Sequence, residues 1–186
     1  HALRRAIELD PLYADALNNL ATIYSHQGKY QDAEPLLIKA LIIEEKAPGE
    51  DHPYMTTYLN NLATVYSNLG KYSDAEPLII KALTIDENGL GKDHPGLAID
   101  LKNAIALYES QGKYAEAELF YRMLLELYRK SLPGDHPDLA AALMGLAALY
   151  RAQKKYQDAE PLLKRALEID EKTLGEDHMD ITVDLN

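Results

Sequence analysis

The sequence of 186 residues predicts an all-α solenoid of stacked antiparallel helix pairs. The first observation is a repeat, because Pro11, Pro53, Pro95 and Pro137 are spaced 42 residues apart. The second is that apolar residues within each repeat follow the period of a helix, with no competing strand pattern. One such repeat cannot bury its apolar face alone, so consecutive repeats stack. A stacked array offers an extended surface, which favours a binding module.

Each repeat is predicted to contain two helices joined by a tight turn. Gly28, Gly70 and Gly112 stop the first helix of repeats 1 to 3, because glycine adopts the left-handed cap conformation without steric cost. Lys154 takes this place in repeat 4, where we expect a more strained turn. In repeat 1 the apolar inner face of the first helix comprises Leu17, Leu20, Ala21 and Tyr24.

The repeat boundaries follow from the proline spacing, with one exception at the start of the chain. From Ala6 to Ala40 is 34 residues, whereas the equivalent step from Ala40 to Ala82 is 42 residues. Residues 1–10 are therefore predicted to be the last helix of a preceding, shorter repeat. We expect nine substantial helices and a short tenth that begins at Asp180. The predicted units are 1–10, repeat 1 (11–52), repeat 2 (53–94), repeat 3 (95–136), repeat 4 (137–178) and the start of a truncated repeat (179–186).

Repeat 3 departs from the others at two packing positions. Ile105 stands where the other repeats have alanine, and so does Leu124. Two larger side chains need extra room in a packed core, so we expect repeat 3 to be the most distorted of the four.

Three runs of residues, in repeat 2 and at its junction with repeat 3, resemble a known family. They are 60–66 (NNLATVY), 70–78 (GKYSDAEPL) and 91–95 (GKDHP). A helix pair with these residues at these offsets resembles the tetratricopeptide repeat, and the 42-residue units resemble those of kinesin light chains. The resemblance covers essentially the whole chain. It implies a right-handed superhelix whose first helices line a concave groove.

The resemblance also implies a function, namely that the groove binds an extended peptide segment of a partner protein, as in an adaptor or scaffold. In kinesin light chains, asparagine side chains of the first helices bond to the main chain of the cargo peptide. An amide suits this role because it carries both a donor and an acceptor. Alternatively, one asparagine of each doublet bonds a neighbouring repeat and only braces the stack. The matching residues are Asn18, Asn19, Asn60, Asn61 and Asn103.

The predicted groove changes in character along the chain. Its stripe of side chains is polar and uncharged in repeats 1 and 2 but small and apolar in repeat 4. Lys102, Met144 and Arg151 complete the predicted peptide-binding set, and Lys102 is expected to meet an acidic residue or a chain carboxylate. We expect the peptide to lie along the first helices of repeats 1 to 3. The alternative is that a following repeat covers the apolar stripe.

Composition limits the partners. Nineteen basic against thirty acidic side chains give a net charge of −11, and such a surface repels nucleic acid and anionic membranes. The absence of cysteine excludes disulfides, cysteine-based zinc sites and thiol catalysis. With no signal peptide or apolar run of membrane-spanning length, we expect a cytoplasmic protein.

No catalytic or cofactor motif is present, so we expect neither an enzyme nor a bound cofactor or metal. The repeated Asp-His pairs, as at 93–94 and 135–136, are interpreted as helix caps rather than metal ligands. Acidic pairs such as Glu44-Glu45 and Asp170-Glu171 are expected to lie on solvated helix surfaces. The alternative function is an architectural or regulatory repeat arm of a larger protein, which acts through its ends or its outer face.

Overall fold

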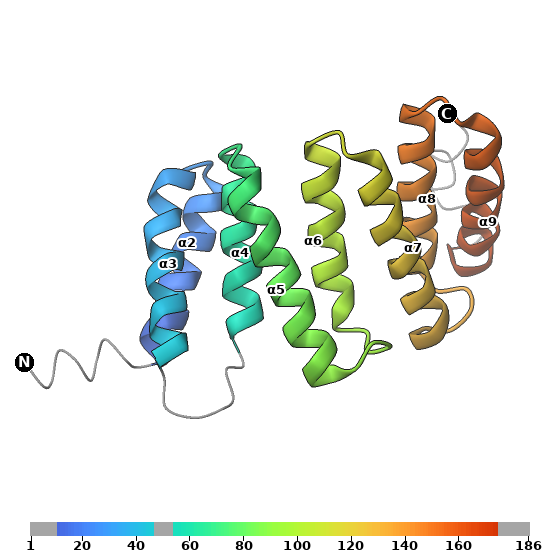
Figure 1. Ribbon diagram of the computed structural model, residues 1–186. Helices are drawn as coiled ribbons and strands as arrows, with labels where there is room; N and C mark the ends of the chain where they lie inside the picture. Colours follow the sequence, from blue (N-terminus) through green and yellow to red (C-terminus); the bar gives the residue numbers. More distant parts are fainter. Residues whose placement is uncertain (1–10, 47–53, 175–186) are drawn as a thin grey trace, which may run out of the picture. The chain divides into compact units, whose positions relative to one another are not determined.

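The computed structural model describes residues 11–46 and 54–174, and every regular element within these ranges is an α-helix (Figure 1). The expected helices at 1–10 and from Asp180 lie outside the described residues. The other eight expected helices are confirmed. They are α2 (Pro11–His26), α3 (Tyr30–Lys46), α4 (Met55–Asn68), α5 (Tyr72–Leu90), α6 (Leu97–Ser110), α7 (Tyr114–Ser131), α8 (Pro137–Ala152) and α9 (Tyr156–Leu174).

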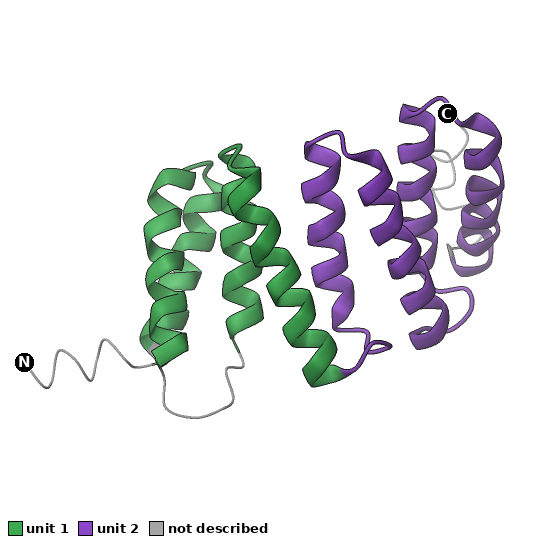
Figure 2. Ribbon diagram, viewed as in Figure 1, with its two compact units in different colours: residues 1–90 green, residues 91–186 purple. Residues whose placement is uncertain are grey.

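The helices form two compact units, residues 1–90 and 91–186 (Figure 2). In unit 1, α2 packs against α3, α3 against α4, and α4 against α5. Unit 2 repeats this order, with α6 against α7, α7 against α8, and α8 against α9. Small residues lie where these helices approach each other, among them the fully buried Ala33 and Ala40 of α3. Each unit therefore contains two helix pairs with a shared apolar core.

The turn between the two helices of each repeat has the same hydrogen bonds throughout. In repeat 1 the amide of Gly28 donates to the carbonyl of Ser25 (3.0 Å), and that of Lys29 donates to the carbonyl of Tyr24 (2.8 Å). This pair of bonds is the Schellman motif, which needs a left-handed residue after the helix. Lys154 adopts that conformation in repeat 4, with φ of 61°. The expected strained turn is confirmed.

A lysine and a glutamate join consecutive repeats within each unit. Lys71 Nζ of repeat 2 lies 2.7 Å from Glu34 Oε2 of repeat 1. Lys155 Nζ of repeat 4 lies 4.0 Å from Glu118 Oε2 of repeat 3. The hydroxyl of Tyr150 also donates to Glu118 Oε1 over 2.9 Å. The lysine that follows the turn of one repeat and the glutamate of the preceding repeat thus supply a link between neighbouring repeats.

The Asp-His pairs before α6 and α8 have two separate roles. The imidazole of His136 caps α8, because its Nδ1 accepts a hydrogen bond from the backbone amide of Asp138 (3.1 Å). His94 Nδ1 accepts equivalently from the amide of Gly96 (3.1 Å). Asp135 instead pairs with Lys172 of α9 (3.2 Å). The capping interpretation is confirmed for His136, whereas α6 begins after Gly96 and has no side-chain cap. Asp135 connects the linker to α9.

The expectation that the acidic pairs are solvated is wrong for two residues. Glu44 is only 2% exposed, and its Oε1 accepts a hydrogen bond from the backbone amide of Tyr54 (3.3 Å). Asp170 is buried at the equivalent position of α9. Glu44 contacts another segment through its hydrogen bond, because Tyr54 lies directly before α4. Neither buried carboxylate has a buried carboxylate next to it in the chain, because Glu45 and Glu171 are exposed.

Candidate functional site

The asparagine doublets of unit 1 divide into buried and accessible members. Asn18 and Asn60 are 5% and 6% exposed, Asn61 is half-buried, and Asn19 is exposed. Asn61 of α4 donates its Nδ2–H to Oδ1 of Asn18 in α2 over 2.7 Å. This bond directly connects the first helices of repeats 1 and 2. It is the bracing interaction that was expected as the alternative to peptide binding. Peptide contacts of these asparagines stay a prediction.

The equivalent pair in unit 2 cannot form such a bond, because its two members are Lys102 and Gly145. A Cβ atom on Gly145 would lie 2.6 Å from the hydroxyl oxygen of Tyr121. Tyr121 stands where repeats 1 and 4 have Leu37 and Leu163. The missing side chain at residue 145 therefore makes room for the tyrosine ring between the first helices.

A hollow of about 290 Å³ lies beside this ring, and we call it the α6–α8 hollow. Its volume is near the lower end of the range of about 300–1,000 Å³ that is typical of ligand sites. The floor is apolar because Ile105 and Leu124, the two large residues of repeat 3, are buried there. The complete lining consists of Lys102, Ile105, Ala106, Glu109, Tyr121, Leu124, Asp138, Ala141 and Ala142.

Three charged side chains surround the α6–α8 hollow. The carboxylate of Glu109 accepts a hydrogen bond from the hydroxyl of Tyr121 over 3.2 Å. Burial of Tyr121, together with the charge of Glu109, raises the pKa of the phenol. The carboxylate of Asp138 is 52% exposed at the first turn of α8. Lys102 Nζ lies 5.7 Å from the centre of the Tyr128 ring. A hydrogen bond to Tyr128 is the main cause that raises the pKa of Lys102, and the charge of Asp138 adds to it.

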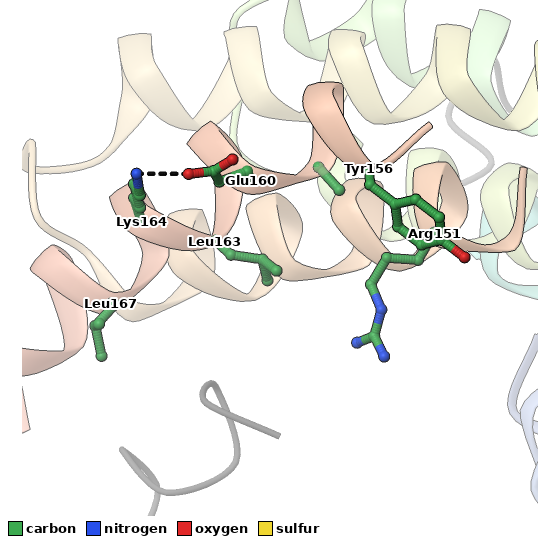
Figure 3. A pocket seen from close by; sticks show the side chains of 7 residues that line it. Arg151, Tyr156, Glu160, Leu163, Lys164 and Leu167 are labelled. Atoms are coloured by element: carbon green, nitrogen blue, oxygen red, sulfur yellow. Dashed lines mark ion pairs between the residues drawn. The ribbon is translucent and has the colours of Figure 1, made fainter. Parts of the chain in front are cut away.

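Arg151 lies apart from the α6–α8 hollow, in a second hollow of about 410 Å³ (Figure 3). Figure 3 shows Arg151 and Tyr156 at one end, with Leu163 and Leu167 along α9. Glu160 pairs with Lys164 over 2.7 Å at its edge. The lining residues are Arg151, Tyr156, Ala159, Glu160, Leu163, Lys164 and Leu167. Lys102 and Arg151 therefore belong to different surfaces of unit 2.

The remaining predicted residues do not line either hollow. Asn103 is half-buried on α6, and Met144 is half-buried on α8. The neighbours of Lys102 in the exposed stripe, Ala106 and Ala141, do line the α6–α8 hollow. Contacts of the predicted residues with a peptide stay a prediction.

Sequence reasoning missed Glu109, Asp138 and Tyr121. A signal was present, because the alignment of repeats pairs an unusual tyrosine with an unusual glycine, Tyr121 and Gly145. Large-for-small changes at Ile105 and Leu124 fall in the same repeat, and both residues prove to form the floor of the hollow. The predicted distortion of repeat 3 stays a prediction.

The fold and this surface define a helical-repeat protein with exposed faces on its first helices. Comparison with protein families gives the same class. The sequence pattern of the tetratricopeptide repeat matches residues 12–88, 54–130, 104–172 and 138–183. The chain belongs to the tetratricopeptide repeat family. Tetratricopeptide repeats are protein-interaction modules, and nothing in the described residues indicates an enzyme.

Solved structures with the same fold include kinesin light chain-like proteins. A Podosopora anserina protein of this kind, with nearly identical TPR-like repeats, is 26% identical, with a TM-score of 0.81 over 94% of this chain and 83% of that chain. BtubC (BKLC) from P. vanneervenii is 26% identical, with a TM-score of 0.80 over 91% of this chain and 68% of that chain. MamA is similar in fold, at 18% identity and a TM-score of 0.64 over 92% of this chain and 86% of that chain.

No curated protein sequence matches the chain. Among the helices of the described residues, none combines the length and the apolar content that crossing a membrane requires.

Proposed function

We propose that this protein binds an extended peptide segment of a partner protein on the exposed face of its first helices, as an adaptor or scaffold. The observation that carries the proposal is the α6–α8 hollow, where an apolar floor is combined with charged groups at the rim. Such a combination suits a side chain that is inserted from a bound segment. The family supports protein binding as the class of function, and the α6–α8 hollow is the site that we propose for it.

In unit 1 the exposed face of the first helices offers polar groups. Asn19, Thr64 and Asn68 are exposed on α2 and α4. Their hydrogen bonds stay within their own helices; for example, Asn68 Nδ2 donates to the carbonyl of Thr64 (2.8 Å). Such groups can exchange a local bond for one to a peptide main chain. Each exchange contributes only about 0.5–1.5 kcal/mol, so we expect micromolar affinity.

The test fills the hollow by substituting exposed residues and leaves the buried core unchanged. Ala106 and Ala141 are exposed and face the α6–α8 hollow, so Ala106→Phe and Ala141→Phe should fill it. Binders are selected from a random library of eight-residue peptides, and their affinity is measured by fluorescence anisotropy. We expect both substitutions to weaken binding at least about ten-fold, with melting temperatures within a few degrees of the wild type.

The matched control is Ala115→Phe, because Ala115 is exposed on α7 but does not line the hollow. It should leave the affinity of the selected peptides unchanged. Failure to select any peptide whose affinity depends on Ala106 or Ala141 would contradict the proposal.

A second candidate function is architectural, through the hollow of Figure 3. Tyr156 is 63% exposed there, and Leu163 and Leu167 are only half-buried. Their equivalents in repeat 1, Leu37 and Leu41, are buried in the core that α2, α3 and α4 share. Sedimentation velocity as a function of concentration tests this role. Association that Leu163→Asp abolishes would support it, and a monomer at all concentrations would argue against assembly between copies.

A further inference from the structure

Charge is the property of the α6–α8 hollow that identifies its ligand. Two carboxylates, Glu109 and Asp138, line the hollow together with one ammonium group, Lys102. The ammonium group is already engaged by Tyr128, over whose ring it lies. A ligand carboxylate would have to compete with Tyr128 and Asp138 for Lys102 and would also meet two like charges.

We infer that the α6–α8 hollow selects a partner segment that inserts a basic side chain, arginine or lysine, whose charged head pairs with the carboxylate of Glu109 or of Asp138. This inference rests on the proposed peptide-binding function and specifies the chemistry of its ligand. The inferred ligand group is therefore basic, whereas Lys102 alone predicted an acidic one.

The shape of the hollow fits the same ligand. Lysine and arginine have an aliphatic stem and a charged head, and the stem packs on apolar surface while the head stays near water. Ile105 and Leu124 provide the apolar floor, and Ala106 and Ala141 are short enough to leave the entrance open. Glu109 is in the last turn of α6 and Asp138 is in the first turn of α8, so the charged head would meet one of these two carboxylates.

Glu109 is prepared for this contact. Its Oε1 accepts from the Tyr121 hydroxyl, which holds the half-buried carboxylate at the hollow. Tyr121 can occupy this place because Gly145 has no side chain. The excess of acidic residues in the whole chain, with a net charge of −11, would also speed the approach of a basic segment.

The experiment uses three acetylated and amidated eight-residue peptides that differ only at one central position, which is arginine, glutamate or norleucine. Their flanking sequence is taken from a peptide whose binding depends on Ala106 and Ala141. Capped ends remove terminal charges, so the central side chain alone sets the difference. We expect the arginine peptide to bind the wild-type protein most tightly and the glutamate peptide least tightly, by at least about ten-fold.

Variants of the hollow then give effects of opposite sign. Glu109→Gln with Asp138→Asn should weaken the arginine peptide about ten-fold or more, since charge-assisted hydrogen bonds are lost. Lys102→Met keeps the aliphatic stem but removes the repulsive charge, so it should strengthen the arginine peptide a few-fold. The matched control is Glu126→Gln with Glu171→Gln, which removes the same charge from exposed sites outside the hollow.

The outcomes separate this inference from the proposed function. If Lys102→Met weakens binding, or if the glutamate peptide binds best, the hollow selects acidic ligands and the inference is overturned while peptide binding stands. Equal loss of affinity in the control and in the hollow variant would also overturn it, because only the overall charge would then matter. If no peptide depends on the hollow, both proposals fail.

Discussion

The hydroxyl oxygen of Tyr121 lies 2.6 Å from the point that a Cβ atom of residue 145 would occupy, so only glycine fits there while the tyrosine keeps its place. Tyr121 belongs to α7 and Gly145 to α8. Their contact replaces the bond that connects the first helices of unit 1. The α6–α8 hollow therefore depends on two substitutions that act together.

Gly145→Ala should lower the free energy of unfolding by about 1–2 kcal/mol, because the added methyl group displaces Tyr121. On helix propensity alone, the same change would stabilise α8 by about 0.5–1 kcal/mol. Urea denaturation monitored by circular dichroism measures the difference. The control is Gly145→Ala in a Tyr121→Leu background, which should restore the benefit of alanine. Stabilisation by Gly145→Ala with Tyr121 present would show that the contact imposes no constraint.

The bond from Asn61 to Asn18 should contribute to stability as a pair. In a double-mutant cycle with alanine, we expect a coupling energy of about 0.5–1.5 kcal/mol between the two residues. Asn68→Ala is the control, because Asn68 bonds only to the backbone of its own helix in the described structure, and it should change stability by less than about 0.5 kcal/mol. A coupling near zero would mean that the bond does not brace the repeats.

The same asparagines allow bracing to be separated from ligand binding. Asn60 and Asn61 are changed together to Ala, and both the melting temperature and the peptide affinity are measured. Weaker binding with a loss of only a few degrees supports a role in the groove. A large loss of stability with unchanged affinity shows that the doublet only braces the stack.

Lys154→Gly should stabilise the protein by about 0.5–1 kcal/mol, because a side chain in the left-handed conformation carries a steric cost that glycine lacks. Thermal and urea unfolding measure the gain. The reverse change in the matching turn of repeat 3, Gly112→Lys, should destabilise by a similar amount. An unchanged or lower stability for Lys154→Gly would indicate that the lysine side chain makes a compensating contact.

Glu118 should make stability depend on pH. Burial alone would raise its pKa, but hydrogen bonds from Arg122 and Tyr150, with the charges of Arg122 and Lys155, hold the pKa below its usual value of 4.5. A lowered pKa in the folded state contributes stability above the unfolded-state pKa, and this contribution is lost as the pH falls through the folded-state pKa.

The difference in stability between wild type and Glu118→Gln should therefore be largest near neutral pH and shrink at acidic pH, below about 4. Urea unfolding at a series of pH values checks this. Tyr150→Phe removes one of the donors to Glu118 and should reduce the pH dependence without abolishing it. A difference that stays constant from neutral to acidic pH would mean that the contacts of Glu118 do not favour its ionised form.

The sequence by itself determined the helices, the turns and the family. These follow from local patterns: apolar spacing selects the helix, a left-handed residue after position Tyr24 or its equivalents ends it, and a fixed period repeats the pair. Even the strained turn at Lys154 could be predicted, because it depends only on backbone geometry within one turn.

Only the tertiary structure decided which side chains of different repeats meet. Asn18 and Asn61 are 43 residues apart, and nothing local distinguishes a bracing amide from an accessible one. The burial of Glu44 and the presence of both Glu109 and Asp138 in the lining of one hollow likewise depend on how neighbouring helices pack. Periodicity specifies which face of a helix is apolar. The width of the space between two such faces depends instead on the volumes of side chains that come from several repeats. Here Tyr121 and Gly145 set that width.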